Sequence, residues 1–203
     1  MRVIEVFDSL QGEGVWTGTP MTFVRLAGCN GPELGLGCVR WCDTPESWAP
    51  ESGEALAVTE ILTMVRLPRV CVTGGEPLIQ AAELRALVAA LHSAGRRVHL
   101  ETNGTLALPT GAKPDWVTVS PKPPDYGVSS WLAGNVDELK FVVDDAFEPE
   151  IAETLSRRFP HAAVCLQPES GGGEQARARA VHEVMSHPTW RLSLQLHKVL
   201  GLR

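Results

Sequence analysis

The pattern of apolar and polar positions predicts strands and helices along most of the chain. Short apolar runs predict strands, and apolar positions spaced three and four apart predict helices. The expected strands cover residues 1–7 (an edge strand or hairpin arm), 21–26, 69–72, 97–100, 116–119, 139–143, 162–166 and 191–196. The expected helices cover residues 59–67, with Thr59 as N-terminal cap, and residues 81–94, 149–159 and 174–185. Strands that are separated by helices or loops predict a parallel α/β fold.

Polar motifs follow the predicted strands at the point where each strand ends. They are a glycine-rich cysteine loop, TGGEP from Thr73, ETNGT from Glu101, SPK from Ser120, QPES from Gln167, and His197. The carboxyl ends of parallel strands share one edge of the sheet, where ligands bind. Six such motifs predict a ligand site at that edge. The strand and helix units are too few for a closed eightfold barrel, so we expect an open, partial barrel with some helices shortened.

Three of the five cysteines, Cys29, Cys38 and Cys42, lie in the glycine-rich loop. No second Cys or His pair follows at finger-like spacing, so a structural zinc site would need a distant fourth ligand. Three thiolates suit a 4Fe-4S cluster in which one iron stays open to a ligand that is not protein. Zinc with a distant ligand and unrelated buried thiols remain alternatives. Cys71 and Cys165 lie inside predicted strands and are expected to be inert, buried thiols.

Composition narrows the class of protein. The 203 residues are 44% hydrophobic and 21% charged, which predicts one globular domain over residues 1–203. No apolar run approaches the ~20 residues of a membrane helix, and the first residues lack a signal-peptide core, so we expect a cytoplasmic protein without membrane contact. The net charge of −6 and the scattered Lys and Arg residues favour a small-molecule substrate over nucleic acid.

Several positions have an ordinary structural interpretation. The SLQGEG segment that starts at Ser9 is either a simple turn or a loop whose glycines let a ligand approach the backbone. Arg25, inside a predicted strand, needs an anionic partner, most commonly in a structural salt bridge. Thr44 beside an aspartate is more often a helix cap than a metal ligand. His197 is equally well explained as a strand-end residue with one backbone hydrogen bond.

The order of SLQGEG, a cysteine loop ending in WCDT, TGGEP, ETNGT, SPK, QP and a terminal LHKVLGL resembles the radical S-adenosylmethionine (SAM) enzymes. Within them, the motifs are similar to the 7-carboxy-7-deazaguanine synthase family. The resemblance covers the chain from Ser9 onward, and its motifs are specific in combination, whereas GGEP alone indicates only the superfamily. It implies an open β/α barrel of the radical SAM type.

The resemblance also implies the reaction, a lyase step of queuosine biosynthesis. In it, 6-carboxy-5,6,7,8-tetrahydropterin becomes 7-carboxy-7-deazaguanine and ammonia through a SAM-derived 5′-deoxyadenosyl radical. The implied cofactors are a 4Fe-4S cluster, SAM and Mg2+. The implied partners are the pterin substrate, an external electron donor such as a flavodoxin, and a second copy of the chain in a homodimer.

The resemblance assigns site residues by motif. Cys29, Cys38 and Cys42 would bind the cluster, and Thr44 would bind Mg2+. The residues implied for SAM are Trp41, Gly74, Gly75, Glu76, Ser120, Pro121, Lys122, Gln167, Pro168, Glu169 and Ser170. The residues implied for the pterin are Leu10, Gln11, Gly12, Glu13, Arg25, Thr73, His197 and Arg203. No residue is assigned as the catalytic acid or base.

Two features depart from the family pattern. The gaps of eight and three residues between the cysteines are both longer than the superfamily usually has. Related chains commonly end in proline, whereas this chain ends in Arg203, which weakens a role for the terminal carboxylate. The alternatives are another radical SAM enzyme, such as a glycyl-radical activase, and a non-catalytic iron-sulfur or zinc module. The activase would not need SLQGEG or the terminal motif, and the module leaves the other motifs unexplained.

Overall fold

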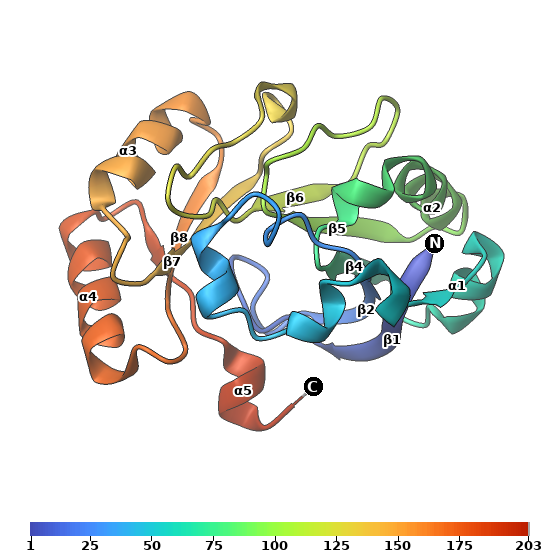
Figure 1. Ribbon diagram of the computed structural model, residues 1–203, viewed down its shortest axis with the longest axis horizontal. Helices are drawn as coiled ribbons and strands as arrows, with labels where there is room; N and C mark the ends of the chain where they lie inside the picture. The colour runs from blue at the N-terminus through green and yellow to red at the C-terminus, as the bar shows by residue number, and fades with distance from the viewer. Residues whose placement is uncertain (203) are drawn as a thin grey trace.

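The computed structural model describes residues 1–202 and is built on one curved, mixed sheet (Figure 1). Its strands are β1 (Arg2–Leu10), β2 (Pro20–Leu26), β3 (Glu54–Ala55), β4 (Arg69–Gly74), β5 (Arg97–Thr102), β6 (Trp116–Val119), β7 (Glu138–Val143), β8 (Ala163–Pro168) and β9 (Arg191–Leu192). They lie in the order β3-β1-β2-β4-β5-β6-β7-β8-β9. Strand β1 pairs antiparallel with β3 and β2, and every later pair is parallel. The two end strands do not pair with each other within residues 1–202, so the sheet is an open barrel, as the sequence predicted.

Except for the short C-terminal helix, the helices lie around the outside of the curved sheet in Figure 1. They are α1 (Val58–Met64), α2 (Ala81–Ser93), α3 (Pro149–Arg158), α4 (Gly173–Ser186) and the short α5 (Leu196–Leu200). Single 3-10 turns occupy Gly37–Arg40, Pro45–Ser47, Pro50–Ser52, Pro77–Gln80 and Ser130–Leu132. The connections from β5 to β6 and from β6 to β7 contain no α-helix, which confirms the expected shortening of the helical layer.

The two faces of the sheet differ in polarity because successive side chains of a strand point to opposite sides. On the face toward the helices, Val98 and Leu100 of β5 belong to one apolar cluster with Leu84 and Leu87 of α2. Burial of this face supplies most of the stabilising hydrophobic contact. The opposite, concave face carries polar side chains, among them Glu101 of β5, and it forms the wall of the site described below.

The prediction for the C-terminal strand is wrong beyond residue 192. Strand β9 comprises only Arg191–Leu192, and His197 lies inside helix α5. The chain leaves the sheet here because the Leu196 N–H donates to the Gly12 carbonyl at 2.9 Å. That bond carries the segment across to the loop between β1 and β2, so a regular β9 cannot continue.

The predicted N-terminal cap of the first helix is also wrong. Helix α1 begins at Val58, so Thr59 lies in its first turn. The Glu60 carboxylate accepts a hydrogen bond from the Ala57 N–H at 2.7 Å, and this satisfies one of the free N–H groups at the helix start. The remaining predicted elements all occur, with bounds that differ by up to three residues.

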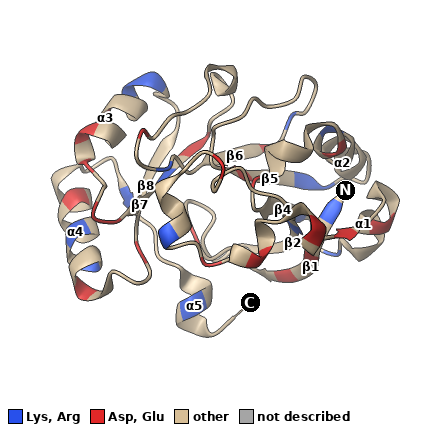
Figure 2. Ribbon diagram, in the orientation of Figure 1, with Lys and Arg blue, Asp and Glu red and all other residues tan. Residues whose placement is uncertain are grey.

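Charged residues are spread over the fold. Figure 2 shows Lys and Arg positions interspersed with Asp and Glu on the helices and on several strands and loops. Within residues 1–202, none of the helices combines the length and apolar character needed to span a bilayer. The expected absence of nucleic-acid partners stays a prediction.

Candidate active site

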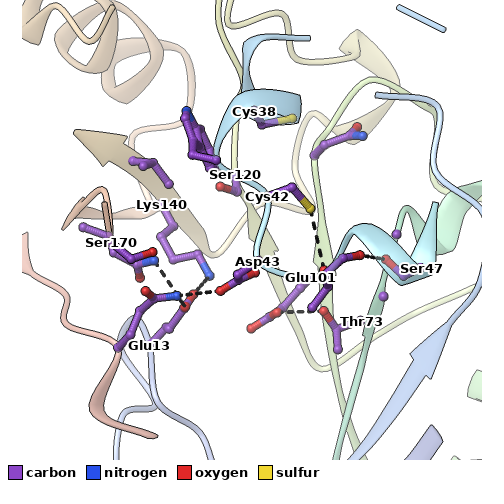
Figure 3. Close-up of a pocket in the computed structure, with 18 of the residues that line it drawn as sticks. Glu13, Cys38, Cys42, Asp43, Ser47, Thr73, Glu101, Ser120, Lys140 and Ser170 are labelled. Atoms are coloured by element: carbon purple, nitrogen blue, oxygen red, sulfur yellow. Dashed lines mark hydrogen bonds and ion pairs between the residues drawn. The ribbon is translucent and has the colours of Figure 1, made fainter. Parts of the chain in front are cut away.

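A cavity of about 370 Å³ opens on the concave face of the sheet (Figure 3). Its walls come from the carboxyl ends of β2, β4, β5, β6, β7 and β8, from the cysteine loop and from α5. The volume lies in the range of small-molecule sites, roughly 300–1,000 Å³. The predicted site residues that line it are Leu10, Gln11, Gly12, Glu13, Arg25, Cys29, Cys38, Trp41, Cys42, Thr44, Thr73, Gly74, Gly75, Ser120, Lys122, Gln167, Pro168, Glu169, Ser170 and His197. Glu76 and Pro121 are not among the lining residues, and Arg203 lies outside the described residues.

The three loop cysteines line this one cavity as free thiols. Gly31 separates two of them, since a Cβ at that position would lie 3.4 Å from the Cys29 Sγ and 3.8 Å from the Cys38 Sγ. The Cys42 Sγ accepts a hydrogen bond from the Trp48 indole at 3.3 Å. Burial raises the pKa of the Cys29 and Cys38 thiols, so binding a metal group there would release protons.

The donor set fits an iron–sulfur cluster. Soft thiolates are the ligands that such clusters prefer. Within residues 1–202, no three His, Cys, Asp or Glu side chains are grouped closely enough to hold one metal ion. Cluster ligands bind different irons and do not need to meet at one point. A cavity lined by three free thiols, with room beside them, therefore suits a cluster.

The cysteine loop is attached to the carboxyl edge of the sheet through Trp41. The indole N–H of Trp41 donates to the Asp144 carboxylate at 2.8 Å, and Asp144 directly follows β7. The Lys122 ammonium lies 5.1 Å from the centroid of the Trp41 ring and donates to Ser120 at 2.7 Å. Burial lowers the pKa of Lys122, an effect that the nearby Cys38 thiolate opposes. A positive charge beside Cys38 in turn favours its thiolate form.

Two glycines at the end of β4, Gly74 and Gly75, let β2 and the start of the cysteine loop pack directly against this strand end. A Cβ on Gly75 would lie 2.2 Å from the Gly28 carbonyl oxygen. Gly74 has φ of +142°, and its Cβ would lie 2.2 Å from the Leu26 carbonyl oxygen. No larger residue fits at these two positions. The glycines therefore allow the end of β4 to lie close to the end of β2 and to the residues that follow it.

Glu76 occupies a structural position behind the cavity. Its side chain is fully buried, with 0% exposure. The carboxylate accepts hydrogen bonds from the Thr102 hydroxyl and the Asn103 N–H, both at 2.7 Å, and from the Leu78 N–H at 3.0 Å. Burial raises its pKa despite these bonds. In this structure, Glu76 joins the TGGEP and ETNGT motifs, and its predicted contact with SAM stays a prediction.

The SLQGEG segment reaches the cavity from the opposite edge of the sheet. Strand β1 is antiparallel to β2, so β1 ends at the edge where the parallel strands begin. The loop then turns under the concave face, where the Gln11 amide donates to Glu101 at 2.9 Å. The ring of His197 packs against Gly12, where a Cβ would lie 1.9 Å from the ring Nδ1. This segment therefore forms the floor of the cavity.

Arg25 has the anionic partner that its position in a strand requires. Its Nε lies 2.9 Å from a Glu5 carboxylate oxygen, which is the salt bridge that sequence reasoning favoured. Arg25 also lines the cavity, close to the ring of Phe7, whose centroid is 5.9 Å from the guanidinium carbon. Both interpretations of Arg25, structural partner and ligand-binding residue, are compatible with this placement.

Some lining residues were not predicted. Among those with charged or amide side chains are Glu101, Lys140, Asp43, Gln195 and Lys198. Lys140 had a signal in the sequence, because it is a charged residue inside an apolar strand and two positions from Glu138. Gln195 and Lys198 both donate to the Asp43 carboxylate, at 3.1 and 2.7 Å. These contacts tie the C-terminal segment to the cysteine loop, and no local pattern predicts them.

An open, mainly parallel sheet with a cavity at the carboxyl ends of its strands, and three thiols in the loop after β2, defines an α/β-barrel enzyme. Curated relatives name the type. The chain is 36% identical to 7-carboxy-7-deazaguanine synthase of Synechocystis sp. over 99% of this chain and 93% of the relative. It is 42% identical to the enzyme of the same name from Bacteroides thetaiotaomicron over 100% of this chain and 98% of the relative. The chain belongs to the 7-carboxy-7-deazaguanine synthase family.

A solved structure agrees with this membership. The crystal structure of QueE from Escherichia coli superposes with a TM-score of 0.80 at 29% sequence identity, and the match covers 97% of this chain and 94% of that one. None of the models of known protein families matches the chain. The shared open barrel confirms the predicted fold class.

Proposed function

We propose that the chain is a radical SAM lyase that converts 6-carboxy-5,6,7,8-tetrahydropterin to 7-carboxy-7-deazaguanine and ammonia in queuosine biosynthesis. One observation supports this most strongly. The three free thiols of the cysteine loop and the SLQGEG floor, which come from opposite edges of the sheet, line the same cavity. A site that must hold a cluster, SAM and a pterin side by side requires such a convergence.

The floor and the neighbouring strand ends offer the polar groups that a pterin needs. Glu101 accepts hydrogen bonds from Gln11 and from the Thr73 hydroxyl, each at 2.9 Å. Burial alone would raise the pKa of Glu101, but the Lys140 ammonium, His99 and the hydrogen bonds from Thr73 and Gln11 together outweigh it and lower the pKa to about 2. The carboxylate therefore remains an acceptor for donor groups of the ring. We assign Arg25 to the substrate carboxylate, which a guanidinium binds with two parallel hydrogen bonds.

The cysteine loop and the carboxyl ends of the neighbouring strands would hold the cofactors. We assign Cys29, Cys38 and Cys42 to the 4Fe-4S cluster and Thr44, whose hydroxyl lies 3.8 Å from the Cys42 Sγ, to Mg2+. When bound, the cluster and SAM supply the one-electron chemistry that removes a hydrogen atom from the pterin. The chain contributes positioning and exclusion of water, since apolar side chains of Phe7, Phe23 and Val142 line the same cavity.

The proposed partners follow from the same assignment. The enzyme would take its electron from a separate donor such as a flavodoxin, act on a free pterin in the cytoplasm without nucleic acid, and form a homodimer. Size-exclusion chromatography with light scattering would measure the mass of the assembly, against 22.0 kDa for one chain.

An anaerobic assay tests the function directly. Protein reconstituted with iron and sulfide is mixed with dithionite, SAM, Mg2+ and 6-carboxy-5,6,7,8-tetrahydropterin, and mass spectrometry follows the deazaguanine product. Formation of product supports both the reaction class and the substrate. Cleavage of SAM to 5′-deoxyadenosine without product would refute the substrate assignment, and an intact cluster without SAM cleavage would refute the radical SAM assignment.

A variant of one thiol tests the cluster ligands. Replacing Cys38 with alanine removes one of the three thiolates, so the reconstituted variant should lose the visible absorbance of the cluster and most of its bound iron. Cys165→Ala is the matched control, because Cys165 is a buried free thiol outside the cavity. A full cluster in the Cys38→Ala protein would remove Cys38 from the ligand set.

A further inference from the structure

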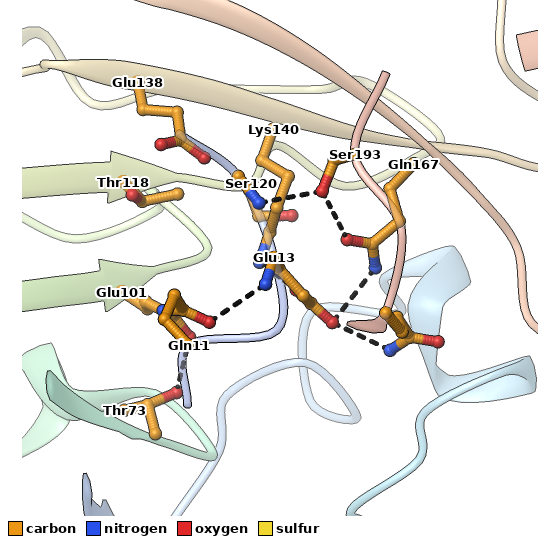
Figure 4. Close-up of polar contacts among 12 residues, drawn as sticks. Gln11, Glu13, Thr73, Glu101, Thr118, Ser120, Glu138, Lys140, Gln167 and Ser193 are labelled. Carbon is orange, nitrogen blue, oxygen red and sulfur yellow. Dashed lines mark hydrogen bonds and ion pairs between the residues drawn. The ribbon is translucent and has the colours of Figure 1, made fainter. Parts of the chain in front are cut away.

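Lys140 is a buried lysine on the concave face, where it lines the cavity. It lies in the middle of β7, and its side chain is only 8% exposed. Glu138 lies two residues earlier on the same strand and therefore on the same face. Figure 4 shows Lys140 among the carboxylates of Glu13, Glu101 and Glu138, which come from the floor loop, from β5 and from β7. A buried ammonium is costly unless it is paired.

The neighbouring carboxylates explain how Lys140 keeps its positive charge although it is buried. Lys140 forms an ion pair with Glu13. Burial would lower the pKa of Lys140, but the charges of Glu13 and Glu101 outweigh it and raise that pKa well above its usual range. In the same way, burial would raise the pKa of Glu13, but the Lys140 charge and the hydrogen bonds from Lys140 and Gln195 together hold that pKa below its ordinary value. The pair is therefore fully charged at neutral pH.

The Glu13 carboxylate is held by side chains that are distant in the sequence. One carboxylate oxygen is bound by Lys140. The other accepts the Gln167 amide at 3.2 Å and the Gln195 amide at 2.8 Å. These donors come from β7, from β8 and from the segment before α5. Side chains from β7, from β8 and from the segment before α5 thus hold the tip of the loop that connects β1 to β2, which lie toward the other end of the sheet.

Two backbone bonds continue the same attachment. The Gly14 N–H donates to the Ser193 hydroxyl at 2.8 Å, and the Val15 N–H donates to the Glu138 carboxylate at 3.0 Å. Gly14 also lies against Glu138, since a Cβ there would be 2.0 Å from its Oε1. Single hydrogen bonds of this kind contribute modestly to stability. Removing one partner of a buried ion pair is strongly destabilising, because it leaves the other charge buried and unpaired.

From this geometry we infer that Lys140 is a positioning residue for the substrate site: its ammonium holds Glu13, and through Glu13 the floor segment 10–14, in the conformation that binds the pterin. The part of the inference that concerns the pterin rests on the proposed function, whereas the part that concerns the loop does not. The competing explanation is that Lys140 only neutralises Glu101 and Glu138 inside the sheet. That explanation gives Glu13 no special importance.

Hydrogen–deuterium exchange tests the loop part without any ligand. Lys140→Met removes the ammonium and keeps most of the apolar stem. We expect exchange in the peptide that covers residues 9–19 to become at least about tenfold faster, while the β5 and β6 peptides keep their protection. Lys113→Met is the matched control, because Lys113 is an exposed loop lysine. Unchanged exchange of residues 9–19 in Lys140→Met would overturn the inference.

A second variant keeps the test valid if Lys140→Met does not fold. The double variant Glu13→Gln with Lys140→Met removes both charges of the pair and leaves no unpaired carboxylate between these two residues. We compare it with Glu13→Gln alone by equilibrium binding of 6-carboxy-5,6,7,8-tetrahydropterin and of SAM to the reconstituted protein. The affinity for SAM shows whether the cysteine loop and the strand ends beside it are still intact.

If Lys140 acts through Glu13, then Glu13→Gln weakens pterin binding roughly ten- to hundredfold. The double variant should then bind the pterin within about twofold of Glu13→Gln, because the lysine has no Glu13 carboxylate left to position. Glu101 keeps the hydrogen bonds from Gln11 and Thr73, which also lower its pKa, and so remains an acceptor. SAM affinity should stay within about twofold throughout. A double variant that binds the pterin a further tenfold more weakly, or a Glu13→Gln protein that binds it normally, would overturn the inference.

The two levels of failure are separable. A wild-type protein that does not bind the pterin refutes the proposed substrate, and the exchange measurement on residues 9–19 then still decides whether Lys140 holds the floor segment. A wild-type protein that binds the pterin, combined with normal exchange in Lys140→Met, refutes only the role of Lys140.

Discussion

The hydrogen bond between Trp41 and Asp144 should couple the stability of the cysteine loop to the end of β7. Trp41 lies between Cys38 and Cys42 in the sequence, and its indole donates to Asp144 at 2.8 Å. The perturbation is a double-mutant cycle of Trp41→Phe and Asp144→Ala. Phenylalanine keeps an aromatic ring and removes the donor, and alanine removes the acceptor, so the cycle isolates this bond.

The magnitude follows from burial and charge. The Asp144 side chain is 6% exposed, and a hydrogen bond to a charged acceptor contributes ~1.5–3 kcal/mol. The indole is only half-buried, so we expect a coupling free energy of about 1–2 kcal/mol. Asp144→Ala should cost more than Trp41→Phe, about 2–4 kcal/mol, because the Ala146 N–H also loses its 3.0 Å bond to Asp144.

Urea unfolding followed by circular dichroism measures the free energy of unfolding without relying on tryptophan fluorescence. A parallel assay follows the loss of cluster absorbance when a chelator is added to the reconstituted protein, which should be faster in both single variants. Trp131→Phe is the matched control, since Trp131 is 78% exposed and should change the free energy by less than ~0.5 kcal/mol. Effects of the two changes that add to within about 0.3 kcal/mol would refute the coupling.

Two further changes test the packing of the fold. Gly75→Ala should destabilise the protein by about 3 kcal/mol or more, because the new Cβ would lie 2.2 Å from the Gly28 carbonyl oxygen; Gly127→Ala, with open space around it, should be nearly neutral, and equal melting temperatures would contradict this reasoning. For Asp115, burial raises the pKa, but hydrogen bonds from the Val98 N–H and neighbouring side chains outweigh it and lower the pKa from 3.8 to about 2. The stability that this carboxylate contributes is therefore complete above about pH 4 and is lost as the pH falls toward 2. Asp115→Ala should lower the free energy of unfolding by about 1–3 kcal/mol at pH 7, and the difference from the wild type should shrink in acid; a difference that is constant between pH 6 and pH 2.5 would disprove the assignment.

The elements and the carboxyl-edge site were predictable because their signals are local. Apolar runs predicted β2 and β4 to β8, and the spacing of Leu84, Leu87 and Leu91 predicted α2. Parallel strands bring their exits to one edge, so the sequence order of the motifs was enough to place most of them around one cavity. Three cysteines in one loop were enough to predict a common site for their thiols.

Local signals failed where a segment's partner lies far along the chain. The segment after Leu192 reads as a continuing strand, but its bond to the Gly12 carbonyl, from Leu196, turns it away from the sheet. The sequence likewise gives no sign of the partners of Glu76, whose buried carboxylate accepts a hydrogen bond from the Asn103 N–H of the ETNGT segment. In both cases, the position of the residue depends on a hydrogen bond to a backbone group far away in the sequence. The local spacing of apolar and polar residues carries no information on such a partner.

The sequence by itself therefore determined the open α/β barrel, the family and the edge of the sheet where the cysteine loop meets the other motifs. Only the tertiary structure decided that the SLQGEG loop comes from the opposite edge to form the floor, and that Lys140 meets Glu13 there. These two residues are 127 positions apart, and each would be poorly tolerated in the interior without the other. Periodicity describes what one residue shares with its near neighbours, whereas the pairing of two buried charges is fixed only when the sheet curves and brings them together.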